Sequence, residues 1–221
     1  MNIKRLLSYF IPINIHQKKS SINNNLEITW NNGKLVLDSK NTNFSYGSLQ
    51  KVLRKGLHEI GLEQIKNLKS ILILGVAGGS VIKTLVEELK FEGKITGVEI
   101  DPDTIELAND YFGLNKIPNL EIIIDDAEQF VETTIEKFDL IVIDIFQDST
   151  MPDFLFEETF VKNYLNQLNT NGYVLFNTII SGKRAENRND TFLTLFDSSK
   201  INIRRLSKIE GNNELLILRK L

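Results

Sequence analysis

The sequence predicts an α/β fold: a Rossmann-like, mostly parallel sheet of seven strands with an antiparallel last strand, plus a small N-terminal β unit. Residues 71–80 read ILILGVAGGS, an apolar run followed by a glycine-rich turn and a segment with helical spacing. Apolar runs then alternate with helical segments as far as residue 180, and two apolar runs form a terminal hairpin. Continuous apolar runs suit strands buried on both faces, and repeated strand–helix winding makes them parallel.

The first 45 residues predict a small antiparallel unit. LEITW and KLVLD flank the turn Asn31-Asn32-Gly33, and INIHQKK supplies a third candidate strand. Asn and Gly tolerate the positive φ angles that a tight hairpin requires. We therefore expect a β-hairpin unit at 1–45 and a Rossmann-like domain at 46–221, which begins with a leading helix in 46–69.

The remaining elements follow in chain order. We expect strands at 71–74, 94–100, 120–124, 139–146 and 173–180, and a final hairpin of 201–206 and 214–220. The spacing of apolar residues predicts helices at 46–61, 81–89, 102–112, 127–138 and 154–168, and a short one at 191–196. An antiparallel last strand is not expected of a dinucleotide-binding domain.

Composition excludes several classes of protein. The 221 residues include no cysteine and two histidines, which excludes disulfides and thiolate metal sites and leaves little for a histidine metal centre. No run approaches the ~20 apolar residues that cross a membrane. Pro12, Asn14 and His16 interrupt the apolar run near the N-terminus, which argues against a signal peptide. We expect a cytoplasmic protein that does not associate with membranes.

Charge is distributed unevenly along the chain. Residues 1–70 carry 11 Lys and Arg against 4 Asp and Glu, whereas residues 71–221 carry 15 against 25. Part of the positive charge lies on the polar face of the leading helix, at Lys51, Arg54, Lys55 and His58. No RNA-binding motif accompanies this face, so we interpret it as a solvated helix surface and expect no nucleic-acid partner.

Acidic residues follow successive strands of the predicted sheet, where an open parallel sheet binds its ligands. They are Glu99 and Asp101 after the second strand, Asp125 and Asp126 after the third, and Asp144 and Asp148 after the fourth, with Asn177 in the fifth. The glycine turn meets neither phosphate motif: Ala77 and Ser80 stand where a dinucleotide fingerprint needs glycine, and no Gly-Lys-Ser/Thr is present.

The turn, with GVEID and IIIDDAEQF, resembles class I S-adenosylmethionine-dependent methyltransferases, and among them the branch that contains spermidine synthase. The resemblance implies the fold named above and a nucleoside sulfonium cofactor, S-adenosylmethionine or its decarboxylated form. It implies that the cofactor is bound by Gly75, Ala77, Gly78, Gly79, Glu99, Ile100, Asp126, Ala127 and Asp144. Glu99 would accept both ribose hydroxyls, and Asp126-Ala127 would bind adenine while Asp126 also caps a helix.

The segment FDLIVIDIFQD resembles the strand of spermidine synthase that ends in a catalytic Asp. Asp144 matches that position, and we predict Asp144 and Asp148 as catalytic residues, with Asp144 as the base for an amine acceptor. Three departures weaken the resemblance to polyamine enzymes. Asp148 lies one residue beyond the position of the family's second Asp. Gly78 stands where the family's glycine loop carries an acidic residue, and Tyr46-Gly47-Ser48 stands where the family has Tyr-His-Glu.

Three functions remain open. Our main prediction is a methyltransferase that acts on a small acceptor. The carboxylates around the site would favour an acceptor that carries a positive charge. The alternatives are an aminopropyltransferase that uses decarboxylated S-adenosylmethionine and a diamine, and a non-catalytic nucleoside-binding dimer. We expect a homodimer. Asp144, Asp148 and Asn177 loosely imitate a magnesium site, but their spacing is not distinctive and we predict no metal.

The segment QDSTMPDFLFEE, at 147–158, is predicted to cover the acceptor. Phe154 and Phe156 would either line the pocket or pack into the core, and we expect at least one of them to pack.

Overall fold

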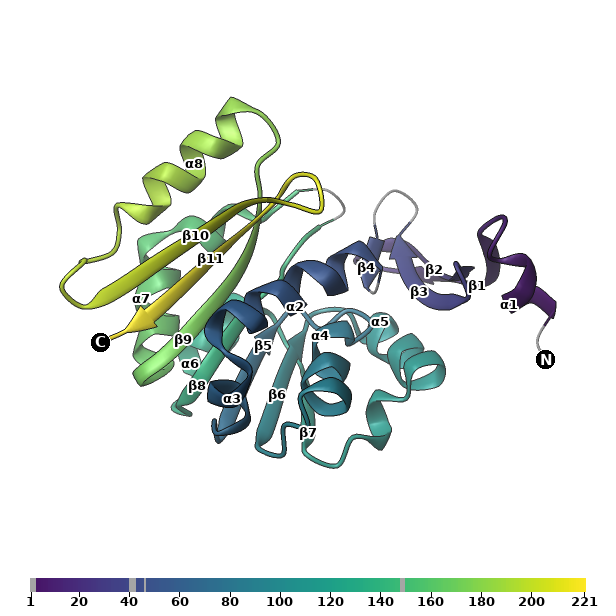
Figure 1. The fold of residues 1–221 in the computed structure, drawn as a ribbon, viewed down its shortest axis with the longest axis horizontal. Helices are drawn as coiled ribbons and strands as arrows, with labels where there is room; N and C mark the ends of the chain where they lie inside the picture. The colour runs from purple at the N-terminus through teal and green to yellow at the C-terminus, as the bar shows by residue number, and fades with distance from the viewer. Residues whose placement is uncertain (1–2, 40–42, 46, 148–149) are drawn as a thin grey trace.

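A computed structural model describes residues 3–39, 43–45, 47–147 and 150–221, and it shows an α/β Rossmann-like fold (Figure 1). The main sheet has the strand order β10-β11-β9-β8-β5-β6-β7. Its strands are β5 (Ser70–Leu74), β6 (Lys94–Glu99), β7 (Leu120–Ile124), β8 (Phe138–Ile143), β9 (Leu168–Ile179), β10 (Ile201–Ile209) and β11 (Asn213–Lys220). All pairs from β9 to β7 are parallel, and β11 is antiparallel to both its neighbours. The predicted sheet, including its antiparallel last strand, is confirmed.

Helices cover both faces of the main sheet. They are α2 (Ser48–Ile60), α3 (Leu62–Lys66), α4 (Ser80–Lys83), α5 (Pro102–Leu107), α6 (Ala127–Thr133), α7 (Glu158–Gln167) and α8 (Lys183–Leu193). The π-helical segments η1 (Thr84–Glu88) and η2 (Ala108–Phe112) continue α4 and α5, and η3 (Leu114–Lys116) and η4 (Asp153–Phe156) are short 3₁₀ helices. Alternate residues of β5 enter two different cores. Ile71 and Ile73 pack on the side of α2 and α3, and Leu72 and Leu74 on the side of α6 and α7. This explains why the strand is apolar at every position.

Several boundaries differ from the prediction, including the start of α7 at Glu158 rather than 154 and the start of β9 at Leu168 rather than 173. α6 ends at Thr133 rather than 138, because Thr134 is extended and Phe138 already pairs with Leu168 as the buried first residue of β8. β8 ends at Ile143 rather than 146, so Asp144 lies just beyond it. α8 begins at Lys183 rather than 191. Its first two turns are polar, and they offered no apolar spacing from which a helix could be predicted.

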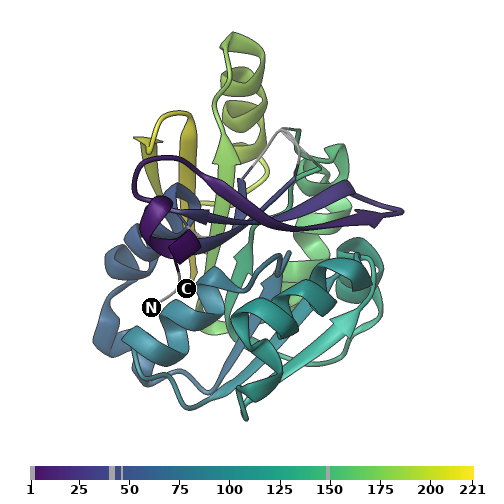
Figure 2. The same ribbon diagram turned by 90° about the vertical axis from the view of Figure 1, so that its right-hand side faces the viewer.

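The N-terminal sheet contains four antiparallel strands: β1 (Ile13–Ser20), β2 (Asn24–Asn31), β3 (Lys34–Ser39) and β4 (Asn43–Ser45). The structure confirms the hairpin turn at Asn32-Gly33 and the third strand, and β4 adds a fourth. A short helix, α1 (Ile3–Leu7), lies at the far end of this unit (Figure 1). Figure 2 shows the N-terminal strands running across the strands of the main sheet.

The N-terminal sheet packs on the main sheet's helical layer. Its buried residues Leu26, Ile28 and Leu37 form one cluster with Leu107 of α5 and Phe112 of η2. The unit therefore buries its apolar face against the Rossmann-like part, as a small antiparallel sheet must do to be stable.

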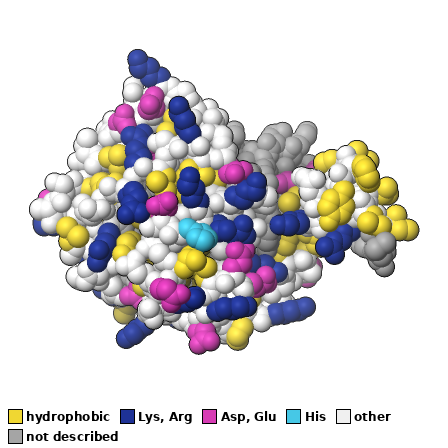
Figure 3. Space-filling model, in the orientation of Figure 1, with side chains coloured by type: hydrophobic (Ala, Val, Ile, Leu, Met, Phe, Trp, Pro, Cys, Tyr) yellow, Lys and Arg dark blue, Asp and Glu magenta, His cyan; other side chains and the backbone are white. Residues whose placement is uncertain are grey.

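The basic face of α2 forms ion pairs with other elements of the same Rossmann-like domain. Lys51 Nζ lies 3.4 Å from Glu210 Oε2, and Arg54 Nη2 lies 2.5 Å from Glu88 Oε1. Lys and Arg side chains are interspersed with Asp and Glu on this side of the molecule (Figure 3). The interpretation of this face as an ordinary helix surface agrees with these contacts.

In the described part of the chain, no helix combines the length and the apolar character needed to span a bilayer. The cytoplasmic location stays a prediction.

Candidate functional site

A cavity of about 290 Å³ opens at the carboxyl ends of the parallel strands. Seven of the predicted site residues line it: Gly75, Ala77, Glu99, Ile100, Asp126, Ala127 and Asp144. Residues at or just after the ends of β5, β6, β7 and β8 thus meet at one edge of the sheet, as the prediction from topology required. Gly78 and Gly79 belong to the same loop but are not in the cavity wall, and Asp148 lies outside the described residues.

Two glycines of the loop serve the fold directly. Gly75 has a φ of 87°, and a Cβ there would lie 2.3 Å from the carbonyl oxygen of Asp144. Glycine at this position therefore allows β5 to end against the backbone of the predicted base. Gly79 has a φ of 77°, and a Cβ there would lie 2.4 Å from the side chain of Leu114. Gly79 is thus explained by packing at the start of α4.

Glu99 ends β6 and is buried beneath the glycine loop. Its Oε2 accepts hydrogen bonds from the backbone N–H groups of Val76 and Ala77, both at 3.0 Å, and its Oε1 accepts one from Asp101 at 3.1 Å. Burial raises the pKa of Glu99, and these three bonds oppose that rise. A carboxylate offers about four acceptor positions. Glu99 can therefore accept one more hydrogen bond, and accepting both ribose hydroxyls would require it to release a backbone N–H.

Asp126 is the N-cap of α6, as the sequence predicted. Its Oδ1 accepts from the backbone N–H groups of Glu128 at 2.7 Å and Gln129 at 3.4 Å. Both bonds fall on one oxygen, and no donor among the described residues is bonded to Oδ2. Asp126 is half-buried in the cavity wall, next to the buried Ala127. Its second oxygen thus retains the acceptor capacity that an exocyclic amine would use.

Asp144 lies directly beyond β8, where its backbone N–H donates to Leu74 of β5 at 2.9 Å. Its Oδ1 accepts one hydrogen bond, from Asn177 Nδ2 at 2.9 Å. Burial raises the pKa of Asp144 to about 6, against the opposing effect of Asn177. A carboxyl with this pKa changes its protonation state near physiological pH, which suits it to proton transfer.

The magnesium arrangement considered from the sequence does not match the geometry around Asn177. This amide turns its N–H, rather than its oxygen, toward Asp144. Among the described residues, no group of three or more His, Cys, Asp or Glu side chains is placed to hold a metal ion.

Asp101 has a role that the sequence did not reveal. It is fully buried, caps α5, and accepts hydrogen bonds from Ser20 Oγ at the end of β1, at 2.5 Å, and from Asn23 Nδ2 in the β1–β2 turn, at 2.7 Å. Asp101 therefore anchors the N-terminal sheet beside the site. As a result, Ile22 and Asn23 of that turn also line the cavity. No local signal predicts this contact, because it joins residues about 80 positions apart.

Phe154 and Phe156 follow β8, and each takes a different one of the two predicted roles, lining the pocket or packing into the core. Phe154 lines the cavity and packs edge-on against Phe160, with ring centroids 5.0 Å apart. Phe156 packs against Phe176 and Phe192 in the core. One of the pair thus lines the pocket and the other packs inside.

Comparison with solved structures shows what this architecture shares with other proteins. A spermidine synthase from Thermotoga maritima has a TM-score of 0.70 at 20% identity, over 94% of this chain and 72% of that one. Human methyltransferase-like protein 13, in complex with SAH, has a TM-score of 0.64 at 21% identity, over 80% of this chain and 83% of that one. At these identities the likeness concerns the fold.

Comparison with curated sequences is more specific. A polyamine aminopropyltransferase from Vibrio vulnificus is 30% identical over 129 residues, which are 57% of this chain and 43% of the relative. The chain spans less than half the length of the first curated relatives that it matches. The family model of the spermine/spermidine synthase domain matches residues 50–187, more than half of the chain. The chain therefore belongs to the spermine/spermidine synthase family.

Proposed function

We propose that this protein is a transferase that moves an aminopropyl group from decarboxylated S-adenosylmethionine to an amine. Its family supports this, and the curated relatives bear the name polyamine aminopropyltransferase. These comparisons favour the aminopropyl alternative over methyl transfer, the main reading of the sequence. The observation that carries the proposal is Asp144, a carboxyl with a pKa of about 6 in the same cavity wall as Glu99 and Asp126.

The cavity offers groups that complement the nucleoside part of the substrate. Glu99 has one free acceptor position for a ribose hydroxyl, and Asp126 Oδ2 can accept from the exocyclic amine of adenine. Ile100 lines the cavity and is 41% exposed, which provides an apolar surface for the base. In this proposal the nucleoside lies over the ends of β6 and β7, and the acceptor lies near the end of β8.

Asp144 supplies the proton-transfer group. The amine nitrogen attacks the propyl carbon, the carbon–sulfur bond breaks, and sulfur leaves with the bonding pair as a neutral thioether. The proton released from the amine passes to the Asp144 carboxylate and then to water. A sulfonium is already an activated leaving group, so the protein needs to hold the two substrates in line and provide this base.

Methyl transfer from S-adenosylmethionine is the second candidate. Gly78 stands where the glycine loop of the family carries an acidic residue, and Gln147 stands where a second catalytic Asp is expected. Both departures remove negative charge that distinguishes the polyamine enzymes. Methyl transfer needs the same nucleoside contacts, so the two functions differ in the group that is transferred.

The test is a direct assay of both donors. Purified protein is incubated with a panel of amines and either decarboxylated S-adenosylmethionine or S-adenosylmethionine, and products are identified by mass spectrometry. We expect aminopropylated amine, and loss of product in Asp144→Asn but not in Glu132→Gln, an exposed carboxylate on α6. Methylated product would support the second candidate. Binding of the nucleoside without product would support the non-catalytic reading.

We also propose a homodimer, as expected from the sequence. Six large apolar side chains near the N-terminus are well exposed, and they are Ile3, Leu6, Leu7, Tyr9, Phe10 and Ile11. Hydrophobic surface gathers at this end of the molecule in Figure 3. Sedimentation velocity should show a species of twice the chain mass, and Phe10→Ser should shift it toward the monomer. A wild-type monomer at all concentrations would contradict the proposal.

A further inference from the structure

Arg188 of α8 joins two separate segments beside the cavity. Its Nη2 lies 3.2 Å from the carbonyl oxygen of Ile179 and 3.6 Å from the sulfur of Met151. Its guanidinium carbon lies 3.9 Å from the centroid of the Phe156 ring. These contacts combine hydrogen bonding with stacking on an aromatic face, which the planar guanidinium allows.

The segments that Arg188 joins form the cavity wall on the side of Asp144. Ile179, at the end of β9, lines the cavity. Within residues 151–156, Pro152 and Phe154 also line it. Arg188 contacts the first and last residues of this 151–156 segment, on either side of the two that face the cavity. Arg188 thus connects the segment to the end of β9, in addition to the packing of Phe156 on Phe176 of β9.

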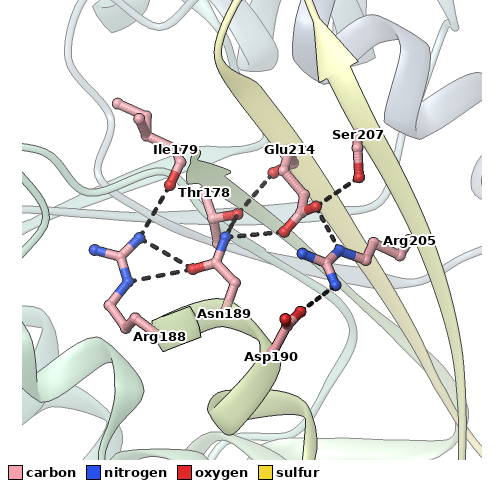
Figure 4. Close-up of polar contacts among 8 residues, drawn as sticks. All are labelled: Thr178, Ile179, Arg188, Asn189, Asp190, Arg205, Ser207 and Glu214. Carbon is pink, nitrogen blue, oxygen red and sulfur yellow. Dashed lines mark hydrogen bonds and ion pairs between the residues drawn. The ribbon is translucent and has the colours of Figure 1, made fainter. Parts of the chain in front are cut away.

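Arg188 is itself held by a buried polar network (Figure 4). Asn189 Oδ1 accepts from Arg188 Nε at 3.2 Å and from Nη2 at 3.0 Å. The Asn189 amide nitrogen donates to Thr178 Oγ1 at 3.0 Å and to Glu214 Oε1 at 2.9 Å. Because Asn189, Thr178 and Glu214 are all fully buried, the position of the arginine is fixed from β9 and β11.

Glu214 connects this buried polar network to β10. Its Oε2 accepts from Arg205 Nε at 2.5 Å and from Ser207 Oγ at 2.6 Å, both on β10. Arg205 Nη1 also donates to Asp190 of α8 at 2.5 Å. The buried charge is therefore paired and hydrogen-bonded, as a charge without water must be. The network ties α8 to the last two strands, on the opposite side of the sheet centre from Glu99 and Asp126.

We propose that Arg188 is a positioning residue for the acceptor: it fixes the 151–156 segment against β9 and so sets where the acceptor lies relative to Asp144. The part about the acceptor rests on the proposed function, whereas the fixing of the segment does not. Burial lowers the pKa of Arg188, but a guanidinium keeps its charge in proteins, so the stacking on Phe156 persists at all physiological pH values.

Hydrogen–deuterium exchange tests the fixing of the segment without requiring activity. Arg188→Met keeps the aliphatic bulk and removes the guanidinium. We expect the backbone N–H groups of Met151 and of residues 153–156 to exchange about tenfold faster, with β5 and β6 unchanged, and Pro152 has no N–H to exchange. Arg204→Met is the matched control, because Arg204 pairs with Glu59 on the surface. Unchanged exchange in 151–156, or an equal increase throughout the chain, would overturn the proposal. Arg188→Lys is measured in the same way should the Met variant not fold.

Steady-state kinetics test the link to the acceptor. In Arg188→Met we expect the KM for the amine to rise about tenfold while the KM for the sulfonium substrate stays unchanged. Arg188→Lys retains the charge without the planar fork and should recover only part of the loss. Equal rises in both KM values would overturn the proposed link. If the wild-type protein transfers no group to any amine, the proposed function fails, and the exchange experiment still decides whether Arg188 fixes the segment.

Discussion

Glu99 and Asp144 line the same cavity from the two strands that flank β5, yet their surroundings differ. Burial raises the pKa of both carboxyls. Glu99 accepts three backbone N–H groups, whereas Asp144 accepts one side-chain amide. The three backbone donors oppose the rise in the pKa of Glu99 and fix its orientation, which suits it to binding. Asp144 has more acceptor capacity left, which suits it to exchanging a proton.

The comparison shows that the hydrogen-bond donors around each carboxyl group determine which chemical role suits it. Both residues are carboxylates at the ends of parallel strands, so their positions in the sheet do not separate them, and the different roles predicted for them came from the family resemblance. What separates them is the number of donors that the fold supplies. The glycine loop folds over Glu99 and presents its N–H groups, whereas the chain beyond Asp144 leads away into the segment that lines the cavity.

The largest expected effect is on catalysis in Asp144→Asn. Removing the proposed base should lower kcat by about 10³-fold, within the range of general-base catalysis. The amide retains the shape of the side chain, so the KM for the sulfonium substrate should change little. Rapid-quench or steady-state assays of aminopropylated product measure this. A loss below about tenfold would place the base elsewhere.

Glu99→Gln should lower the stability of the folded protein. The glutamine oxygen can accept from Val76 and Ala77, but its NH₂ group then faces the N–H of Asp101 and leaves that donor without a partner. We expect the free energy of unfolding to fall by about 1–3 kcal/mol, measured by urea titration. Glu121→Gln, an exposed position on β7, is the control and should change stability by less than ~0.5 kcal/mol. Equal stability of the two variants would contradict the backbone role of Glu99.

The pH dependence should distinguish Asp144 from an ordinary surface carboxylate. Its pKa is about 6 in the folded protein against 3.8 as the ordinary value, so the folded state binds more protons between these values. The stability of the wild type relative to Asp144→Asn should therefore fall as pH rises from about 4 to 7. The rate should rise over the same interval as the carboxylate forms. Unfolding titrations and initial rates at several pH values measure both trends, and a rise in relative stability would contradict the assignment.

The smallest effect separates two roles of Asp126. Asp126→Asn keeps an oxygen for the helix cap but places an NH₂ group opposite the position that we propose for the adenine amine. Its unfolding free energy should stay within ~0.5 kcal/mol of the wild type, whereas Asp126→Ala should lose about 1 kcal/mol with the cap. Both variants should bind the nucleoside more weakly. Normal binding by Asp126→Asn would show that Oδ2 makes no contact with adenine.

The central strands β5, β8 and β9 could be predicted because each contains an apolar run that is buried on both faces of the sheet. β5 is the clearest case, since alternate residues enter opposite faces of the sheet. The start of α8 could not be predicted, because its first turns bury little apart from Asn189. Burial of a polar residue depends on partners in β9 and β11, which no local pattern shows.

The same limit applies to the site: the positions of its residues could be predicted, but their tertiary contacts could not. Topology alone brought Glu99, Asp126 and Asp144 to one edge, and the structure places all three in one cavity wall. The contacts that distinguish them are made with backbone groups or with distant residues. Asp101 is held by the N-terminal turn, and Arg188 reaches Met151 and Phe156 across more than thirty positions. Such contacts arise from tertiary packing, so spacing along the chain does not reveal them.

The most direct test of the contrast between the two acids is calorimetric titration of decarboxylated S-adenosylmethionine into the wild type, Glu99→Gln and Asp144→Asn. We predict that Asp144→Asn binds within about threefold of the wild type and that Glu99→Gln binds at least about tenfold more weakly. Equal loss of binding in the two variants, or normal binding by Glu99→Gln, would contradict the assignment of Glu99 to binding and Asp144 to proton transfer.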